Sequence, residues 1–197
     1  MKNIFALLVL SLSLSACPQK VKESAKPVPG KQPTRNKVAN AVEKVSATKK
    51  IVVTPGKTYT IKYPEGWELK PKFMGTDSMA LSMPEGPKDL FRENINVVLE
   101  KVAVKDTQAY YDANLRAMER AMTDFKKISK TDIKLASGIP AINLVYTHRM
   151  GQISAKNRAV FIYQKGTGYV ITATAKPDTF TKFNPQFEEI IQSFTVK

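Results

Sequence analysis

Alternating polar and apolar residues over the last third of the chain constrain the fold most. Period-two alternation is typical of β-strands with one buried face, and short Gly-containing breaks between such segments favour tight turns. Strands joined consecutively by tight turns pair antiparallel, so the pattern predicts a four-stranded antiparallel meander. The four predicted strands are residues 128–135, 141–149, 153–164 and 169–175.

Further strands and two helices are predicted around this meander. Short apolar or alternating runs predict strands at 51–53, 59–63, 79–83 and 94–102. A helix is predicted to start after Asp106, an acidic N-cap, and a second to start at Asn184 and Pro185. Phe180 and Phe183 are expected to continue the packing of the second helix upstream. These elements predict an α+β fold, an antiparallel sheet of about six to seven strands flanked by two main helices.

The first predicted helix carries one apolar stripe, spaced 4, 3, 4 and 3 residues apart, which we expect to pack on the sheet. The stripe consists of Tyr111, Leu115, Met118, Met122 and Phe125. Its methionines could instead line a groove or a metal site, although this spacing favours a core role.

Two other positions suggest how the sheet is covered. Trp67, the only tryptophan, follows the turn at 64–66 and is expected to fill the core rather than to stack on a ligand. In the segment 153–164, Lys156 and Arg158 precede Val160 and Ile162 on one face. This change from polar to apolar suggests a strand that extends beyond its covering helix.

The N-terminus reads as a lipoprotein signal. Lys2 precedes an apolar run that is too short to span a bilayer, and residues 14–16 lead into Cys17, the only cysteine. Leu-Ser-Ala-Cys resembles the bacterial lipobox, which implies a signal peptide at 1–16 and acyl chains, palmitate among them, on Cys17. If the source is Gram-negative, Pro18 after the cysteine, in place of an aspartate, points to the outer membrane, periplasmic face.

Residues 17–50 are predicted to form a lipidated, disordered tether. Of the formal charge of +14, residues 18–50 carry +7, with four prolines and no aromatic residue, so this segment cannot bury enough apolar surface to fold. The tether's charge could attract anionic head groups or simply keep it solvated. The globular domain is predicted to comprise residues 51–197. With Cys17 acylated, no thiol is left for a disulfide or a catalytic nucleophile.

A long polar connection at 84–93 is the best candidate for a partner-contact loop, because long loops on a rigid sheet often bind other molecules. Its candidate contact residues are Glu85, Lys88, Asp89, Arg92 and Glu93. The alternative is a loop that is only solvated.

The inventory of reactive side chains does not predict an enzyme. His148 is the only histidine, so a two-histidine metal site is impossible and any catalytic triad would depend on that one residue. Its place in a predicted strand favours a structural role. The acidic residues lack the pattern of a calcium loop. We predict no catalytic residue, no metal site and no cofactor, although a pair of carboxylates brought together by the fold stays open.

Several segments between residues 58 and 196 form a recognisable series. They are Tyr-Pro-Glu-Gly-Trp at 63–67, Asn-Ile-Asn-Val-Val at 94–98, the helix after Asp106, Gly-Ile-Pro-Ala at 138–141, the strand at 169–175 and the closing helix with Ser193 and Phe194. Taken together, in this order, they resemble the PsbP-like superfamily, and more narrowly its bacterial DcrB-like envelope lipoproteins. This resemblance implies an α/β/α sandwich and proteins that bind partners, and it supplies no catalytic residues.

These observations lead to a functional expectation. We expect a membrane-anchored periplasmic lipoprotein that acts as a non-enzymatic protein-binding or adaptor module of the cell envelope. The alternatives are an immunity lipoprotein that neutralises a periplasmic toxin, and a small-ligand or metal-ion binding module. The expected partners are the membrane, through the lipid anchor, and an envelope protein. Nucleic acid is disfavoured by compartment, and the oligomeric state is open.

Overall fold

The computed structural model describes residues 51–56, 58–87 and 89–197. The predicted signal peptide, Cys17, the predicted tether and Lys88 lie outside the described residues. No helix within the described part of the chain is both long enough and apolar enough to cross a membrane.

The described residues form two sheets and two helices. The elements are β1 (Ile51–Pro55), β2 (Tyr59–Pro64), β3 (Glu68–Pro71), β4 (Ser78–Leu81), β5 (Asn94–Lys101), α1 (Thr107–Ala121), β6 (Thr123–Lys134), β7 (Pro140–Met150), β8 (Ile153–Gln164), β9 (Thr167–Ala175), α2 (Phe180–Gln192) and β10 (Thr195–Val196).

The main sheet has seven antiparallel strands in the order β3-β4-β5-β9-β8-β7-β6. The predicted α+β class and the predicted meander are confirmed, since β6, β7, β8 and β9 pair in sequence order. A second sheet of three strands, in the order β1-β2-β10, was not separated from the first by the sequence pattern. β3 was also missed, because it has only four residues and none of them is buried.

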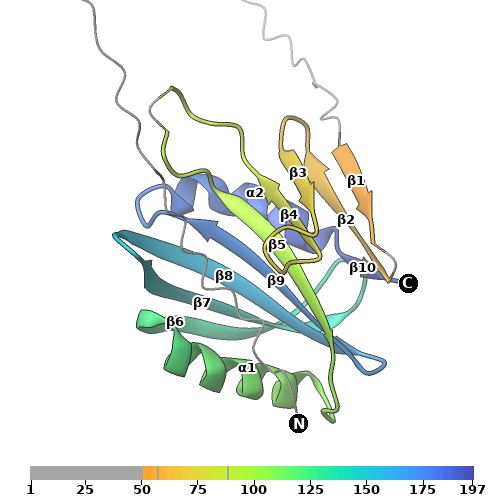
Figure 1. Cartoon of the computed structure of the whole chain (residues 1–197). Coiled ribbons are helices and arrows are strands. Elements are labelled where there is room, and N and C mark those ends of the chain that lie inside the picture. Colours follow the sequence, from red (N-terminus) through yellow and green to blue (C-terminus); the bar gives the residue numbers. More distant parts are fainter. Residues whose placement is uncertain (1–50, 57, 88) are drawn as a thin grey trace, which may run out of the picture. The chain divides into compact units, whose positions relative to one another are not determined.

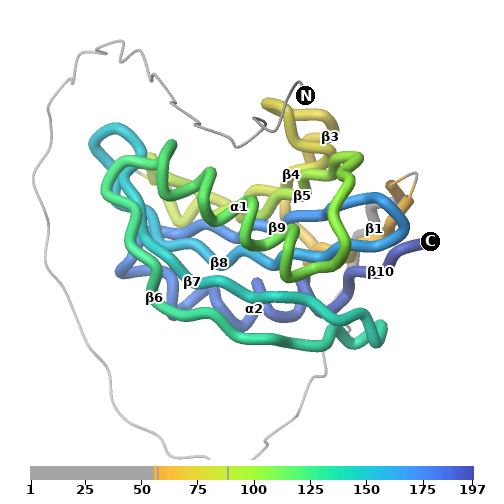
Figure 2. Tube along the Cα trace, turned by 90° about the horizontal axis from the view of Figure 1, so that it is seen from below, coloured from red at the N-terminus to blue at the C-terminus, as the bar shows by residue number. Residues whose placement is uncertain are grey.

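The two helices lie on opposite faces of the main sheet, as Figures 1 and 2 show. On one face, α1 packs mainly on β7 and β8, where Tyr111 meets Phe161 with ring centroids 5.4 Å apart. On the other face, α2 and the small sheet cover a larger core that contains Phe187 and Phe194. The protein is therefore a three-layer sandwich, with separate apolar clusters on the two sides of the sheet.

Period-two alternation explains how one sheet serves two cores. On β8, Ala159 and Phe161 belong to the α1 cluster, whereas Val160 and Ile162 belong to the α2 cluster. Successive side chains on a strand point to opposite faces, so an apolar stretch of this kind is buried on both sides.

Local signals fix the ends of several elements. Asp106 caps α1 as predicted, with its carboxylate accepting from the backbone N–H of Ala109 at 2.7 Å. Gly66 has φ +85, a left-handed conformation that favours glycine in the turn after β2. Trp67, which follows, is 8% exposed and packs edge-on against Phe187, so its predicted core role is confirmed.

The start of α2 differs from the prediction. The helix begins at Phe180, and Pro185 lies inside it rather than at its first position. The i−4 residue of Pro185 is Thr181, in the first turn, so the proline removes only one hydrogen bond near the helix end. Burial of Phe180 and Phe183 in the core, which the sequence did predict, favours the longer helix.

The longer α2 also corrects the expected overhang of β8. Arg158 is 9% exposed and forms an ion pair with Glu188 of α2, while its Nε donates to Asn143 Oδ1 at 2.8 Å. Lys156 Nζ lies 4.6 Å from the ring centroid of Phe180. α2 thus covers this strand face at Lys156 and Arg158, whereas Ser154, on the same face nearer the start of β8, is exposed as expected.

Candidate functional site

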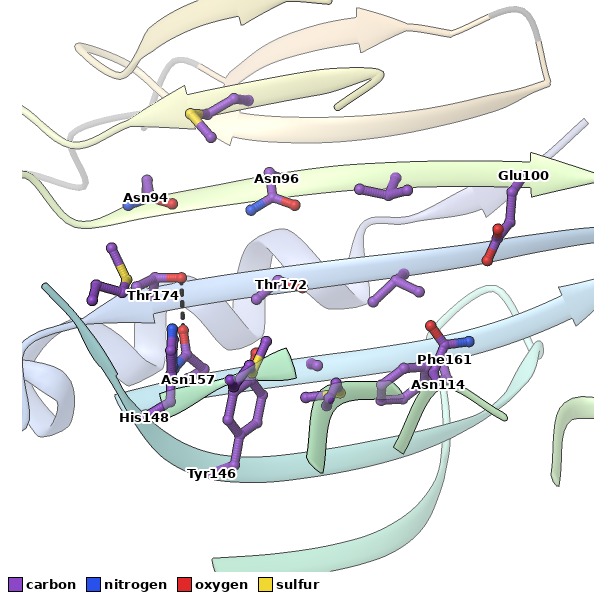
Figure 3. A pocket seen from close by; sticks show the side chains of 17 residues that line it. Asn94, Asn96, Glu100, Asn114, Tyr146, His148, Asn157, Phe161, Thr172 and Thr174 are labelled. Carbon is purple, nitrogen blue, oxygen red and sulfur yellow. Dashed lines mark hydrogen bonds between the residues drawn. The ribbon is translucent and has the colours of Figure 1, made fainter. Parts of the chain in front are cut away.

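A cavity of about 90 Å³ lies on the α1 side of the main sheet. We call it the α1 cavity (Figure 3). Its walls are residues of β4, β5, β9, β8 and β7 that point to the same face, together with two residues of α1, Asn114 and Met118, and Met122, the residue after the helix. Asn94, Thr172 and His148 are only half-buried, so the cavity opens to the surface.

The floor of the cavity is a row of polar side chains across neighbouring strands. Asn94 and Asn96 of β5 stand opposite Thr174 and Thr172 of β9 in the sheet register. Residues directly opposite on an antiparallel pair have side chains on the same face. Figure 3 shows these four side chains along the two strands.

Part of this floor is free to bind. Within the described part of the chain, the Asn96 amide and the Thr172 hydroxyl make no side-chain hydrogen bond, although Asn96 is only 7% exposed. Asn94 donates to the backbone oxygen of Arg92 at 3.3 Å, which leaves its own amide oxygen available. The floor therefore offers amide and hydroxyl groups to an occupant of the cavity.

A hydrogen-bonded chain holds His148 at one end of the cavity. The Thr174 hydroxyl donates to Asn157 Oδ1 at 2.9 Å, and the Asn157 amide nitrogen lies 2.9 Å from His148 Nδ1. The imidazole also contacts the ring of Tyr146, with centroids 5.7 Å apart. Burial lowers the pKa of His148, so its imidazole is neutral near pH 7. Its other ring nitrogen, Nε2, has no hydrogen-bond partner among the described residues.

Methionines form much of the apolar wall. Four of the seven methionines of the chain line the α1 cavity: Met79, Met118, Met122 and Met150. The predicted core role holds for Met118, which is 2% exposed, whereas Met122 is half-buried. The stripe thus belongs partly to the core and partly to a cavity, and Phe125 lies beyond the helix on β6.

At the opposite end lies Glu100, the only carboxylate among the described residues that line the cavity, and it accepts a hydrogen bond from the Tyr110 hydroxyl at 2.9 Å. Burial raises the pKa of Tyr110 well above its ordinary value, and the neighbouring Glu100 charge acts in the same direction. No Lys or Arg lines the cavity, so its described walls do not suit an anion.

The loop predicted as a partner contact lies apart from this cavity, and none of its described residues lines it. Glu85 forms an ion pair with Lys182 of α2. Asp89 accepts from the backbone N–H groups of Glu85 and Phe91 at 3.0 and 3.1 Å, and these bonds, the one from Glu85 first, lower its pKa. Lys88 lies outside the described residues.

The last two predicted contact residues hold the loop to the domain. Arg92 donates from Nε to the backbone oxygen of Ser82 at 2.6 Å and forms an ion pair with Glu68. Glu93 is 1% exposed, and its carboxylate accepts from Thr179 Oγ1 at 2.6 Å and from Ser82 Oγ at 3.4 Å. Among the described residues of the loop, the large apolar side chain exposed to solvent is Leu90, at 79%.

Sequence reasoning missed most of the α1 cavity. One sequence signal could have indicated it. Asn94 and Asn96 are two residues apart on one predicted strand and so share a face. Asparagine is depleted in strands, so two on one face indicate a role other than strand formation. Asn157, Thr174 and Met150 carried no such signal, because their meeting depends on the register of three strands.

Among the described residues, no group of three or more His, Cys, Asp or Glu side chains could hold a metal ion. The chemistry that the α1 cavity displays is therefore hydrogen bonding by its amide and hydroxyl groups, together with the thioether and imidazole groups of its methionines and His148.

Comparison with known proteins relates the fold to a class. No protein-family model matches the sequence, and no curated protein matches it. Solved structures do match. Cyanobacterial PsbP (CyanoP) of Synechocystis is 16% identical, with a TM-score of 0.58 over 80% of this chain and 98% of that one.

Two further matches have similar geometry. LpqN, involved in cell envelope biogenesis of Mycobacterium tuberculosis, is 17% identical, with a TM-score of 0.55 over 75% of this chain and 91% of its own. The Ran-binding protein Mog1p of Saccharomyces cerevisiae is 12% identical, with a TM-score of 0.52 over 75% and 95%. The domain therefore has the PsbP-like fold, and the resemblance predicted from sequence is confirmed at the level of the fold.

Proposed function

We propose that the chain is a lipid-anchored, non-enzymatic binding module of the bacterial cell envelope, and that the α1 cavity is where it holds a protein partner. The observation that carries this proposal is the partner-free amide and hydroxyl pair, Asn96 and Thr172, on the floor of a methionine-walled cavity. An occupant of the cavity displaces water from these groups and must replace its hydrogen bonds, so the pair selects an occupant with polar groups at that position.

The size of the cavity favours a side chain over a free small molecule. Sites for drug-sized ligands usually measure about 300–1,000 Å³, whereas the α1 cavity measures about 90 Å³. A volume of this size fits one apolar side chain of a partner, whose neighbouring peptide groups would meet Asn96 and Thr172. Methionine walls suit such an anchor because they adapt to its shape.

The compartment rests on sequence and on one structural neighbour. Cys17 in its lipobox supports an anchor at the periplasmic face of the outer membrane, and two or more acyl chains anchor stably. LpqN, which shares the fold, is involved in cell envelope biogenesis. Among the described residues, the single neutral histidine and the scattered carboxylates support a binding rather than a catalytic role.

The anchor is tested by expressing the full chain and its Cys17→Ser variant in a Gram-negative host. Lipidation predicts that the wild-type protein sediments with outer membranes and that mass spectrometry finds acyl chains on Cys17. The variant should lose both properties. Equal membrane association of the two proteins would contradict the anchor.

The binding site is tested by affinity capture from detergent-solubilised envelopes, comparing two single variants. Asn96→Leu fills the floor of the α1 cavity, whereas Leu90→Ser changes the exposed apolar tip of the 84–93 loop. Loss of one specific partner with Asn96→Leu alone supports the cavity. Loss with Leu90→Ser alone would place the contact on the loop, and the site proposal would be wrong. An immunity lipoprotein, the narrower version of this function, would yield a tight 1:1 complex with a toxin.

A further inference from the structure

A soft metal ion is a second kind of occupant for which the α1 cavity has suitable groups. We propose that His148, Met122 and Met150 bind a soft monovalent cation of the Cu(I) class at the end of the cavity that His148 occupies. This inference does not depend on a protein partner, since it concerns the chain alone.

The first argument is the concentration of donors. The only histidine of the chain and four of its seven methionines line this one cavity. The two exposed methionines of the domain, Met74 and Met83, lie elsewhere. Thioether sulfur selects Cu(I) over harder ions, and imidazole suits copper as well. The described residues also offer no group of three carboxylate, imidazole or thiolate ligands for a harder ion.

The second argument is that the fold brings these donors to one end. His148 and Met150 are two residues apart on β7, so their side chains share a face. The start of α1 meets β8 where Tyr111 contacts Phe161. Just after the helix, Phe125 contacts Tyr146, with ring centroids 5.3 Å apart. Met122 follows the last residue of α1 and therefore lies at the Tyr146 and His148 end.

The third argument concerns the histidine ring. Metal-binding histidines usually hydrogen-bond through the nitrogen that does not hold the metal. Nδ1 of His148 is occupied by Asn157, and Nε2 has no partner among the described residues. Nε2 carries the lone pair when the proton is on Nδ1 and Nδ1–H donates to the Asn157 amide oxygen. This requires the Asn157 amide to rotate by half a turn, which places its nitrogen next to the Thr174 hydroxyl. The hydroxyl can then accept from that nitrogen, so the Asn157 amide is hydrogen-bonded in either orientation.

The environment also suits a cation. Among the described residues, no Lys or Arg lines the cavity to repel one. Met122 and Met150 are half-buried, which gives the ion a path from solvent.

The test uses Ag(I), a redox-inert ion with the same preference for sulfur. The full chain carries Cys17→Ser in every sample, because a free thiol would bind silver by itself. Calorimetric titration in mild detergent should give one saturable site per chain. Met122→Leu, Met150→Leu and His148→Gln should each weaken binding by about tenfold or more. The control variants Met74→Leu and Met83→Leu should leave it unchanged.

Variants of Asn157 distinguish metal binding at His148 from a general effect on packing. In Asn157→Asp, the carboxylate can only accept hydrogen bonds, which fixes the proton of His148 on Nδ1 and the lone pair on Nε2. The silver affinity of this variant should therefore equal or exceed that of wild type. Asn157→Leu should lower it about 10- to 100-fold, as for other groups that orient a metal ligand. In samples with ¹³C-labelled methionine methyl groups, Ag(I) should shift the resonances of Met122 and Met150 only.

The proposal is overturned if no saturable site is found at micromolar Ag(I). It is also overturned if the Met122→Leu and Met150→Leu variants bind silver as tightly as wild type does. Equal losses of silver affinity in these variants and in the control variants Met74→Leu and Met83→Leu would overturn it as well. The thermal stability of each variant is measured in parallel without silver, so that a folding defect is not counted as lost binding.

Discussion

The ring of Tyr110 on α1 lies directly over the backbone of Gly168 on β9. A Cβ atom at Gly168 would stand 2.3 Å from Tyr110 Cζ and 2.7 Å from its hydroxyl oxygen. The same hydroxyl donates to Glu100 of β5 at 2.9 Å. Because Gly168 has no side chain, α1 approaches the sheet closely, and the Tyr110 hydroxyl reaches Glu100, which lines the α1 cavity.

We predict that Gly168→Ala destabilises the protein. The methyl group must displace a ring that is 1% exposed, and overpacking of a close-packed core typically costs about 1–3 kcal/mol. Urea unfolding of wild type and variant measures the difference. Gly86→Ala is the matched control, since a Cβ there meets nothing within 4 Å. An equal effect of both changes would contradict the close approach.

A second prediction concerns alkaline pH. Burial raises the pKa of Tyr63 to about 12 from an ordinary value of 10.0, and burial also raises the pKa values of Tyr59, Tyr110 and Tyr146. The folded state therefore retains protons that the unfolded state releases. Stability from these groups is fully present below pH 10 and falls as the pH rises above it.

The measurement is the free energy of unfolding between pH 8 and pH 11, together with tyrosinate absorbance. Tyrosinate should appear together with unfolding rather than before it. Tyr63→Phe should reduce the slope of stability against pH, because one of the groups with a raised pKa is gone. Titration of all tyrosines in a still folded protein would contradict this prediction.

A third prediction concerns Glu93, which holds the 84–93 loop to the start of α2. Glu93→Ala leaves Ser82 and Thr179 without their shared acceptor in a buried place, which typically costs about 1–3 kcal/mol. Amide exchange should rise in residues 82–93 and in the first turn of α2. The control is Glu85→Ala in the same loop. Its ion pair with Lys182 is largely exposed, and we expect no measurable loss.

The sequence predicted the sheet better than the helix ends. Strands β6 to β9 could be predicted because the pattern extends over seven or more residues in each and each break contains a residue suited to a turn. The start of α2 could not. Asn184 and Pro185 form a good local start signal, but burial of Phe180 and Phe183 outweighs it, and burial depends on the whole fold.

The candidate site was harder to predict for a related reason. The charged loop at 84–93 was predicted to contact a partner. In the structure, however, Arg92 and Glu93 form hydrogen bonds with backbone and side-chain groups of the domain itself. The α1 cavity draws between one and four residues from each of five strands, among them Asn157, Thr174 and His148. Their side chains meet only through pairings between distant segments, which no local pattern specifies.

The last prediction concerns Arg158, whose charged group lies between β8 and α2. Glu188 and Asn143 both contact it, and Glu188 keeps 42% of its side chain exposed. Loss of one partner from a fully buried pair costs about 3–5 kcal/mol, so Glu188→Leu should cost less, about 1–2 kcal/mol, because water reaches the remaining charge. Arg158→Leu combined with Glu188→Leu should recover most of that loss, since an apolar pair leaves no charge unpaired. A double-mutant cycle in urea measures the coupling, and strictly additive losses would show that the ion pair does not hold α2 on the sheet.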